Sequence, residues 1–380
     1  MPSREPFVRV GLEVGPDSVR ADAAGGLRVT DLAAGRELTS PDGDDGWVLL
    51  PDGDRVTTGG GQHGRRLRLR PRRSGRPVTV GDRSYRGLVD VYTVPGHGLV
   101  VVNQLDLETY LRGVVGLEIG PRRPDEDAAV RAQAVAARTY AIANLGRRDS
   151  LGFDVFGGVL DQVYGGRNAE RDRVSRAVRA TEGQILVHAG RPIRAYYHST
   201  GGGSTARVSD VWNLPDAPYL RSVSDRRPDG GFYCEASPRF RWRERWTRPE
   251  LDRAVRRGLA GYFGVDSSRV GPVRGLEVLD RTDGGRITRL EVRTEGGRWI
   301  LTRDDIRFVL RTPDGRALRS TRFRIERRPG QGEGLRLRGR GYGHGIGMCQ
   351  WGAIGRARAG QGYREILAHY YSGAELRQAY

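Results

Sequence analysis

The stretch Asp125–Leu145, DEDAAVRAQAVAARTYAIANL, is the clearest element of the sequence. Acidic residues occupy its first turn, alanine fills its middle and Gly146 follows its last apolar residue, an arrangement typical of a helix and its ends. Its apolar residues recur with helical spacing and predict one buried stripe. Because the many alanines predict very close packing, Gln133 and Arg138 are expected to point inward or to line a site, with a solvated helix face as the alternative.

A second helix is predicted just before this one. Asp106 is a good N-cap in front of the apolar spacing of residues 107–115, and glycine and proline end the helix within 116–121. This places Glu118 at a helix end among apolar neighbours. Apolar surroundings raise the pKa of a carboxyl group, as a general acid requires at neutral pH. Taken alone, however, the spacing fits a surface glutamate better than a catalytic one.

Two glycine-rich loops lie far from these helices in the sequence. The segment 195–205, AYYHSTGGGST, predicts a strand that ends in a loop where a ligand can approach the backbone closely. The segment 339–348, GRGYGHGIGM, alternates glycine with larger side chains, so His344 is expected to be presented rather than buried. It lacks the Lys-Ser/Thr of a phosphate-binding loop and the strand–helix context of a dinucleotide site. An ordinary turn and a tight irregular crossing are the alternatives.

The remaining elements indicate an α+β protein without regular βαβ order. We expect a β-rich N-terminal part, a helical catalytic segment at 105–180, and a mixed β/α C-terminal part with a substrate groove. The expected regions are a β-rich N-terminal region at 1–95, a catalytic core at 96–235, an α+β insertion or second lobe at 236–330, and a segment at 331–380 whose loop and helices complete the core.

The charge of the chain is unusual. Its 380 residues carry a net charge of +18, and all 64 cationic residues are arginine. GC-rich codons explain the absence of lysine, whereas selection for bidentate binding of carboxylate or phosphate is the functional alternative. Most of the excess lies in two stretches, 65–76 and 307–340.

Both basic stretches contain strands in which leucine and arginine alternate, at 66–70 and 335–338. A period of two puts leucine on one face of a strand and arginine on the other. The arginine faces are either solvated or form the wall of a cationic groove for a polyanion. Because zinc-finger spacing, a recognition helix and ribonucleoprotein aromatic motifs are all missing from the sequence, we expect no nucleic-acid partner.

Neither a secretory signal nor a membrane span is visible in this sequence. Residues 1–14, MPSREPFVRVGLEV, contain no apolar signal core, and no run of 18 apolar residues occurs. We therefore expect no transmembrane segment in this chain. The two cysteines, Cys234 and Cys349, are expected to be separate thiols, with a disulfide as the alternative.

Taken together, these segments resemble the stage II sporulation protein D family, the SpoIID/LytB domain of bacterial cell-wall enzymes. The family's helix ending in Val-Val-x-x-Glu corresponds to Tyr110–Glu118, and its Ala-Gln-Ala-Val-Ala-Ala-Arg-Thr-Tyr helix to Arg131–Tyr140. Its later motifs correspond, in order, to Gln162–Gly166, Tyr197–Thr205 and Gly343–Ala353. The match spans about 95–375 in the family's order.

The resemblance implies a peptidoglycan lytic transglycosylase that cleaves the β-1,4 bond between N-acetylmuramic acid (MurNAc) and N-acetylglucosamine (GlcNAc). The family substrate is glycan stripped of its stem peptides, and the family's catalytic acid corresponds to Glu118. One carboxyl group suffices: it protonates the leaving oxygen and then takes a proton from the sugar's own 6-hydroxyl, which closes a 1,6-anhydro ring. Ordinary glycosidases need two carboxyl groups. Glu108, nearly three helical turns before Glu118, is expected to be solvated.

The motifs also provide a set of candidate substrate-binding residues: Gln133, Arg138, Tyr197, His198, Ser199, Thr200, Tyr342, His344 and Gln350. The expected partners are peptidoglycan glycan strands and a cell-wall amidase. From the substrate, the expected location is extracytoplasmic, in the cell envelope. A non-catalytic enhancer of an N-acetylmuramoyl-L-alanine amidase and a polysaccharide-binding module are the alternatives.

The chain departs from the family pattern at two positions. Some members have a cysteine in the loop after Tyr-His-Ser and hold zinc, whereas this chain has Gly201 there. We therefore expect no cofactor, with a zinc site formed by His188, His198 and Cys234 as the alternative. Cys349 stands where the family usually has serine, and is interpreted as a small buried substitute.

Overall fold

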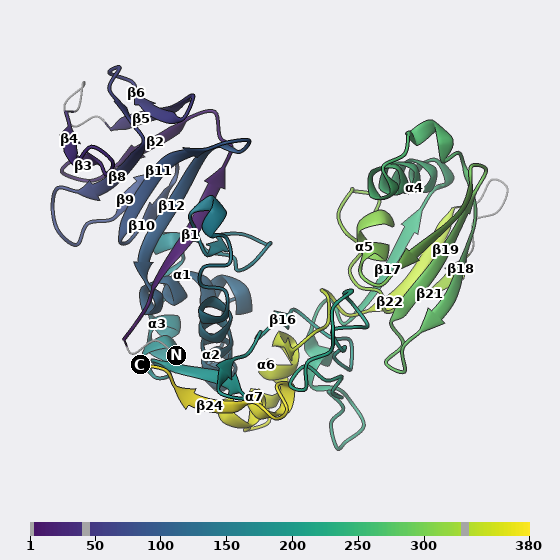
Figure 1. The fold of residues 1–380 in the computed structure, drawn as a ribbon. Helices are drawn as coiled ribbons and strands as arrows, with labels where there is room; N and C mark the ends of the chain where they lie inside the picture. Colours follow the sequence, from purple (N-terminus) through teal and green to yellow (C-terminus); the bar gives the residue numbers. More distant parts are fainter. Residues whose placement is uncertain (1–3, 40–45, 328–333) are drawn as a thin grey trace. The chain divides into compact units, whose positions relative to one another are not determined.

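The computed structural model describes residues 4–39, 46–327 and 334–380. It is a mixed α+β structure with a β-rich N-terminal part, as predicted (Figure 1). The chain divides into two compact units, which are described separately. Unit 1 comprises residues 1–194 and 375–380, and unit 2 comprises residues 195–374.

Unit 1 contains two large sheets (Figure 1). The first has the strand order β13-β1-β12-β11-β8-β3-β4, and the second has the order β10-β9-β2-β5-β6-β7. Their strands are β1 (Phe7–Val14), β2 (Val19–Asp22), β3 (Leu27–Asp31), β4 (Arg36–Leu38), β5 (Trp47–Asp52), β6 (Arg55–Thr58), β7 (His63–Gly64), β8 (Arg66–Pro71), β9 (Val78–Val80), β10 (Arg83–Tyr85), β11 (Leu88–Val94), β12 (Gly98–Asp106) and β13 (Val155–Phe156). Alternate residues of these strands, such as Leu67 and Leu69 of β8, are fully buried and form the core of the unit.

The described part of unit 1 also contains the helices α1 (Leu107–Ile119), α2 (Asp127–Ala143) and α3 (Asp172–Arg179); α1 and α2 lie between β12 and β13 in the sequence, and α3 follows β13. A small sheet, β15-β14-β24, is formed by β14 (Gln184–His188), β15 (Arg191–Pro192) and the C-terminal β24 (Glu375–Gln378). Strand β12 continues directly into α1. The expected cap from the Asp106 side chain is not formed, because the carboxylate of Glu5 accepts the N–H of Glu108 at 2.7 Å instead.

The middle of the unit 2 sequence forms a lobe with its own hydrophobic core; in Figure 1 the lobe carries the labels from β17 to β22 together with α4 and α5. Its buried apolar residues all lie between 242 and 337. They are covered by two three-stranded sheets, β17-β22-β21 and β18-β19-β20, and by two helices. These elements are β17 (Arg241–Trp246), α4 (Arg248–Phe263), β18 (Val273–Arg281), β19 (Ile287–Thr294), β20 (Gly297–Thr302), α5 (Asp305–Val309), β21 (Phe323–Arg327) and β22 (Leu335–Arg340).

The rest of unit 2 surrounds a short parallel pair of strands. Strand β16 (Tyr197–His198) pairs with β23 (Met348–Cys349), and α6 (Gln350–Arg358) and α7 (Tyr363–Tyr370) follow β23. No helix in the described part of either unit is long and apolar enough to cross a membrane.

The expected region boundaries at 95 and 235 both fall inside these units. Strand β1 pairs with β12 along its whole length and also with β13, so the N-terminal strands and the catalytic helices share one unit. The separate core of the lobe runs from Trp242 to Leu337, the latter in β22.

Candidate active site

Glu118 lies in the last turn of α1 and its side chain is half-buried. Gly120 ends the helix by donating its N–H to the carbonyl of Gly116, in a conformation (φ +76°) that favours glycine. The backbone N–H of Val163 donates to Oε1 of Glu118 at 2.6 Å. A backbone donor from a distant loop therefore positions the predicted catalytic carboxylate.

The segment Gln162–Gly166 brings this donor to α1. Gly165 donates its N–H to the carbonyl of Gly113 at 3.1 Å. The ring of Tyr164 lies where Gly113 has no side chain, since a Cβ there would meet that ring at 2.6 Å. The Tyr164 hydroxyl also donates to Asn103 at 2.8 Å. These contacts hold the segment Gln162–Gly166 against α1. They explain why Val163, which belongs to this segment, reaches Glu118.

Tyr110 is the buried neighbour of Glu118 on α1. Its ring centroid lies 5.1 Å from that of Tyr164, and its hydroxyl donates to Gln162 at 3.1 Å. Burial, followed by the charge of Glu118, raises the pKa of Tyr110 well above its usual value. Tyr110 is therefore a neutral hydrogen-bond donor beside the acid.

Asp161 is a second carboxylate near this loop, and both of its oxygens have hydrogen-bond or ion-pair partners. Its side chain has no exposed surface. Tyr140 donates to one oxygen at 2.7 Å, and Arg148 forms an ion pair with the other at 2.8 Å. Asp161 thus stabilises the loop. Because it is buried and both of its oxygens have partners, it does not serve as a second catalytic carboxylate.

Arg138 does not face solvent. Its side chain has no exposed surface, and it forms a bidentate ion pair with Glu108, at 2.6 Å from Nε to Oε1 and 2.8 Å from Nη2 to Oε2. It also donates to the carbonyls of Val178 and Gln184. The structure therefore gives Arg138 a fold-stabilising place. It also corrects the expectation for Glu108, which is 6% exposed because α2 brings Arg138 to it.

Gln133 is also fully buried, together with most of α2 from Ala129 to Ile142. The close packing predicted from the alanines is confirmed. The alternative of a solvated helix face is wrong for Gln133 and Arg138, because both point inward.

In unit 2 the two glycine-rich loops come together. Strands β16 and β23 pair through Tyr197 with Met348 and through His198 with Cys349. Thr200 and Tyr342 exchange backbone hydrogen bonds at 3.1 and 2.8 Å. Segments about 140 residues apart in the sequence therefore form one structure.

Both histidines of these loops are neutral. His344 accepts the N–H of Ile346 at Nδ1, so its Nε2–H donates to the carbonyl of Tyr197 at 3.0 Å. Burial, with Arg307 and Arg286, lowers the pKa of His344 to about 3. Burial and then His344 lower the pKa of His198 well below its usual value. His344 is half-buried and ties the loop to β16, rather than being presented as expected.

The predicted binding residues of unit 2 differ in their exposure. Thr200, His198 and Gln350 are buried, whereas Tyr197, Ser199, Tyr342 and His344 are half-buried. Ser199 lines a cavity of about 620 Å³ together with Arg239, Arg241, Arg243, Trp242 and Trp351, among others. The guanidinium of Arg239 lies 4.2 Å from the ring centroid of Tyr342. Sequence reasoning missed these arginines and tryptophans, although the RFRWRERW run at 239–246 was a visible signal.

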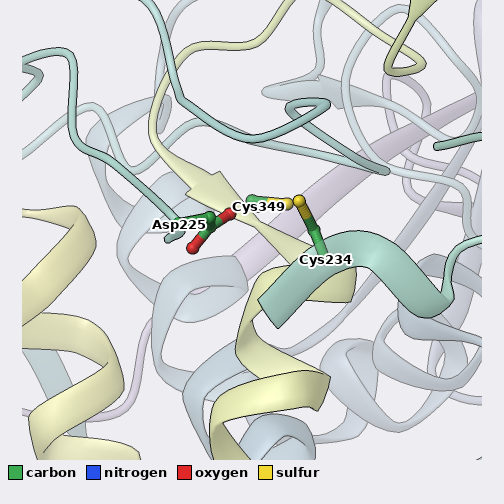
Figure 2. A group of neighbouring side chains, drawn as sticks. All are labelled: Asp225, Cys234 and Cys349. Carbon is green, nitrogen blue, oxygen red and sulfur yellow. The ribbon is translucent and has the colours of Figure 1, made fainter. Parts of the chain in front are cut away.

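Asp225, Cys234 and Cys349 form a group with metal-ligand chemistry, shown in Figure 2. All three are fully buried, and their ligand atoms lie within 4.8 Å of one another. The set differs from the zinc alternative, because the structure groups Cys234 with Asp225 and Cys349, and His188 belongs to unit 1. Both cysteines are free thiols. Sulfur Sγ of Cys349 accepts backbone N–H groups from Gly201 and Gly352 at 3.3 and 3.2 Å.

Comparison with known proteins identifies the family. Residues 95–188 match the family model described as stage II sporulation protein. An uncharacterised protein of Brachyspira hyodysenteriae is 32% identical over 285 residues, which cover 73% of this chain and 68% of the relative. The chain belongs to the stage II sporulation protein D family. The lobe corresponds to a second match, at residues 228–347, to a domain of unknown function.

Two further relatives carry informative names. Stage II sporulation protein D of Bacillus amyloliquefaciens is 29% identical over 306 residues, covering 77% of this chain and 79% of the relative. The amidase enhancer of Bacillus subtilis is 28% identical over 281 residues, covering 65% of this chain and 38% of that protein. The family and these relatives support a function related to the cell wall.

Proposed function

We propose that this protein is a peptidoglycan lytic transglycosylase. It cleaves the MurNAc-β-1,4-GlcNAc bond of peptide-stripped glycan strands and leaves 1,6-anhydroMurNAc ends. The observation that carries the proposal is the half-buried carboxylate of Glu118, held by the N–H of Val163 at the end of α1.

Glu118 acts as acid and then as base in this mechanism. The hydrogen bond from the Val163 N–H holds the carboxylate of Glu118 in place. Glu118 first protonates the glycosidic oxygen and then accepts the proton of the sugar's 6-hydroxyl. Because that hydroxyl is the nucleophile, no second carboxylate is needed. The fully engaged Asp161 agrees with this single-acid scheme.

The substitution Glu118→Gln tests the mechanism. Glutamine keeps an acceptor for the Val163 N–H but cannot deliver the proton, so release of anhydro-sugar products should fall by about 10²–10⁴-fold or more. The substrate is purified glycan already freed of peptides, with no amidase present, and the products are identified by mass spectrometry. Asp125→Asn, an exposed carboxylate change close by, is the matched control and should keep full activity. Full activity of Glu118→Gln would refute the assignment.

The second candidate is a non-catalytic enhancer of a cell-wall amidase, and the name of the Bacillus subtilis relative favours it. In that case Glu118→Gln would stimulate the amidase as well as the unmodified protein does, and neither would release anhydro products. Under both proposals the protein works in the cell envelope, outside the cytoplasm, on peptidoglycan and beside an amidase.

A further inference from the structure

One face of the sheet β17-β22-β21 in the lobe carries arginine at nearly every position. The opposite face packs Trp246, Leu335 and Leu337 into the lobe core. Strand register and burial place seven arginines on the outer face: Arg241, Arg243, Arg245, Arg324, Arg336, Arg338 and Arg340. We call these seven residues the arginine face.

Like charges lie directly opposite each other on this face. In the strand register, Arg241 lies opposite Arg340, Arg243 opposite Arg338, and Arg245 opposite Arg336. On the other side of β22, Arg338 lies opposite Arg324. Directly opposed like charges destabilise a sheet. A negatively charged ligand would relieve the repulsion in these four opposed pairs and so stabilise the face.

Few acidic groups neutralise these arginines. Among the described residues, Glu235 pairs with Arg241 at 3.2 Å, and Glu326 lies 3.5 Å from Arg324 and 3.8 Å from Arg338. The other four arginines form no ion pair within the described ranges. Burial, together with Arg241 and Arg338, lowers the pKa of Arg340.

The first basic stretch has a different environment. On β8, Arg66 and Arg68 both bind the buried Asp90, at 2.9 and 2.8 Å. The guanidinium of Arg66 also lies 4.7 Å from the ring centroid of Tyr92. Two of the three arginines of β8 therefore share one buried carboxylate, a partner that the arginine face lacks among the described residues.

Two cavities of unit 2 adjoin the arginine face and share Arg241. One, of about 340 Å³, is lined by Arg241, Arg322, Arg324, Arg338 and Arg340, with Phe323 and two glycines. The other is the 620 Å³ cavity that contains Ser199, Trp242 and Trp351. Trp242 is 6% exposed, and its indole N–H has no hydrogen-bond acceptor in the described structure. A cavity that combines tryptophan and arginine side chains fits an acidic sugar, which offers ring faces, hydroxyls and a carboxylate.

We propose that the arginine face binds peptide-free glycan through the lactyl carboxylates of its muramic residues. The inference rests on the proposed function, because it assigns that substrate a second binding surface remote in sequence from Glu118. A carboxylate on every disaccharide is a regular polyanion and complements a row of guanidinium groups, which bind carboxylates bidentately. Glycan that keeps its stem peptides lacks these free carboxylates, because they are joined to the peptide as amides. The face thus selects stripped over unstripped strands.

The test compares two charge-matched double variants. Arg338→Gln/Arg340→Gln removes two charges from the face, and Arg256→Gln/Arg257→Gln removes two exposed charges from α4. The dissociation constant for soluble peptide-free strands is measured at low and at physiological ionic strength. We expect the face variant to lose at least about tenfold in affinity and much of its salt dependence, and the α4 variant to lose neither. The melting temperature of the face variant should stay equal or rise, because like-charge repulsion on the sheet is relieved.

Two chemical controls identify the ligand group. Strands whose lactyl carboxylates have been converted to amides should bind the unmodified protein as weakly as native strands bind the face variant. A phosphodiester wall polymer serves as competitor. If it displaces the glycan at equal or lower concentration, or if the face variant binds as well as the unmodified protein, the carboxylate assignment is wrong.

The two proposals fail separately. Arginine-dependent binding without anhydro products would overturn the transglycosylase and keep the glycan-binding face. Anhydro products with binding that ignores Arg338 and Arg340 would overturn the face and keep the enzyme.

Discussion

Replacing Arg138 by methionine separates its two interpretations. The sequence motif made Arg138 a substrate-binding candidate, whereas the structure buries it against Glu108 with no exposed side-chain surface. Arg138→Met keeps much of the side chain's length but removes the counter-charge. Glu108 would then keep two hydrogen-bond donors: the hydroxyl of Tyr380 and the N–H of Gly183, which lies 3.4 Å away.

An uncompensated buried charge determines the expected magnitude. Breaking a buried ion pair by removing one partner costs about 3–5 kcal/mol. In a unit of this size, 1 kcal/mol corresponds to about 2–4 °C in melting temperature, so Arg138→Met should melt about 10 °C lower. The double variant Glu108→Gln/Arg138→Met removes both charges of this pair and should recover a large part of this loss.

The assay is thermal unfolding followed by circular dichroism, together with kcat and KM on peptide-free glycan well below the lower melting temperature. Arg131→Met, an exposed arginine on the same helix, is the control and should leave the melting temperature within about 1–2 °C. We expect KM to be unchanged in Arg138→Met. An unchanged melting temperature combined with a large rise in KM would show that Arg138 contacts substrate and that the reasoning from burial is wrong.

Two further predictions concern unit 2. The pKa of His344 is near 3 in the folded protein, below its unfolded value of about 6.5. The stabilising effect of neutral His344 is therefore complete above pH 6.5 and is lost as the pH falls from there towards 3, by at most about 1.4 kcal/mol per pH unit. The variant His344→Gln should flatten the acid limb of a plot of unfolding free energy against pH, and an unaltered limb would contradict this. Cys234 and Cys349 are both fully buried, and burial, Cys234 and Asp225 raise the pKa of Cys349. Both cysteines should therefore resist alkylation in the native protein at pH 8 and react fully after unfolding, as measured by intact mass; rapid labelling of the native protein would contradict their burial.

Local elements were the predictable part of the fold. The 125–145 stretch gave a helix from Asp127 to Ala143, and the strand-like regions on both sides became sheets. The start of α1 was placed correctly, but its cap was not, because Glu5 lies about 100 residues away in the sequence. Likewise, the extent of unit 1 depends on the pairing of β1 with β12, which local patterns do not encode.

The candidate site was predictable as a set of segments but not as a set of roles. The motif around Glu118 was recognised, and so was the segment Gln162–Gly166, but only the structure shows that this segment lies against α1 and that Val163 reaches Glu118. What each polar residue contacts could not be read from the motif. Arg138 sits on a helix whose alanines bring α1 close enough for an ion pair with Glu108, and only the packing of the two helices shows this.

The Leu–Arg alternation shows why charge must be followed to its partners. Both basic strands have the same period of two, and both bury their leucines. The difference lies in the neighbouring strand: β11 offers Asp90 opposite Arg68, whereas β17 offers arginine opposite each arginine of β22. A buried carboxylate holds two of the three arginines of the first strand, whereas every arginine of the second strand lies opposite another arginine. The excess of arginine therefore reflects two physical situations, and the second leaves a row of opposed arginines on one sheet face for an anionic polymer.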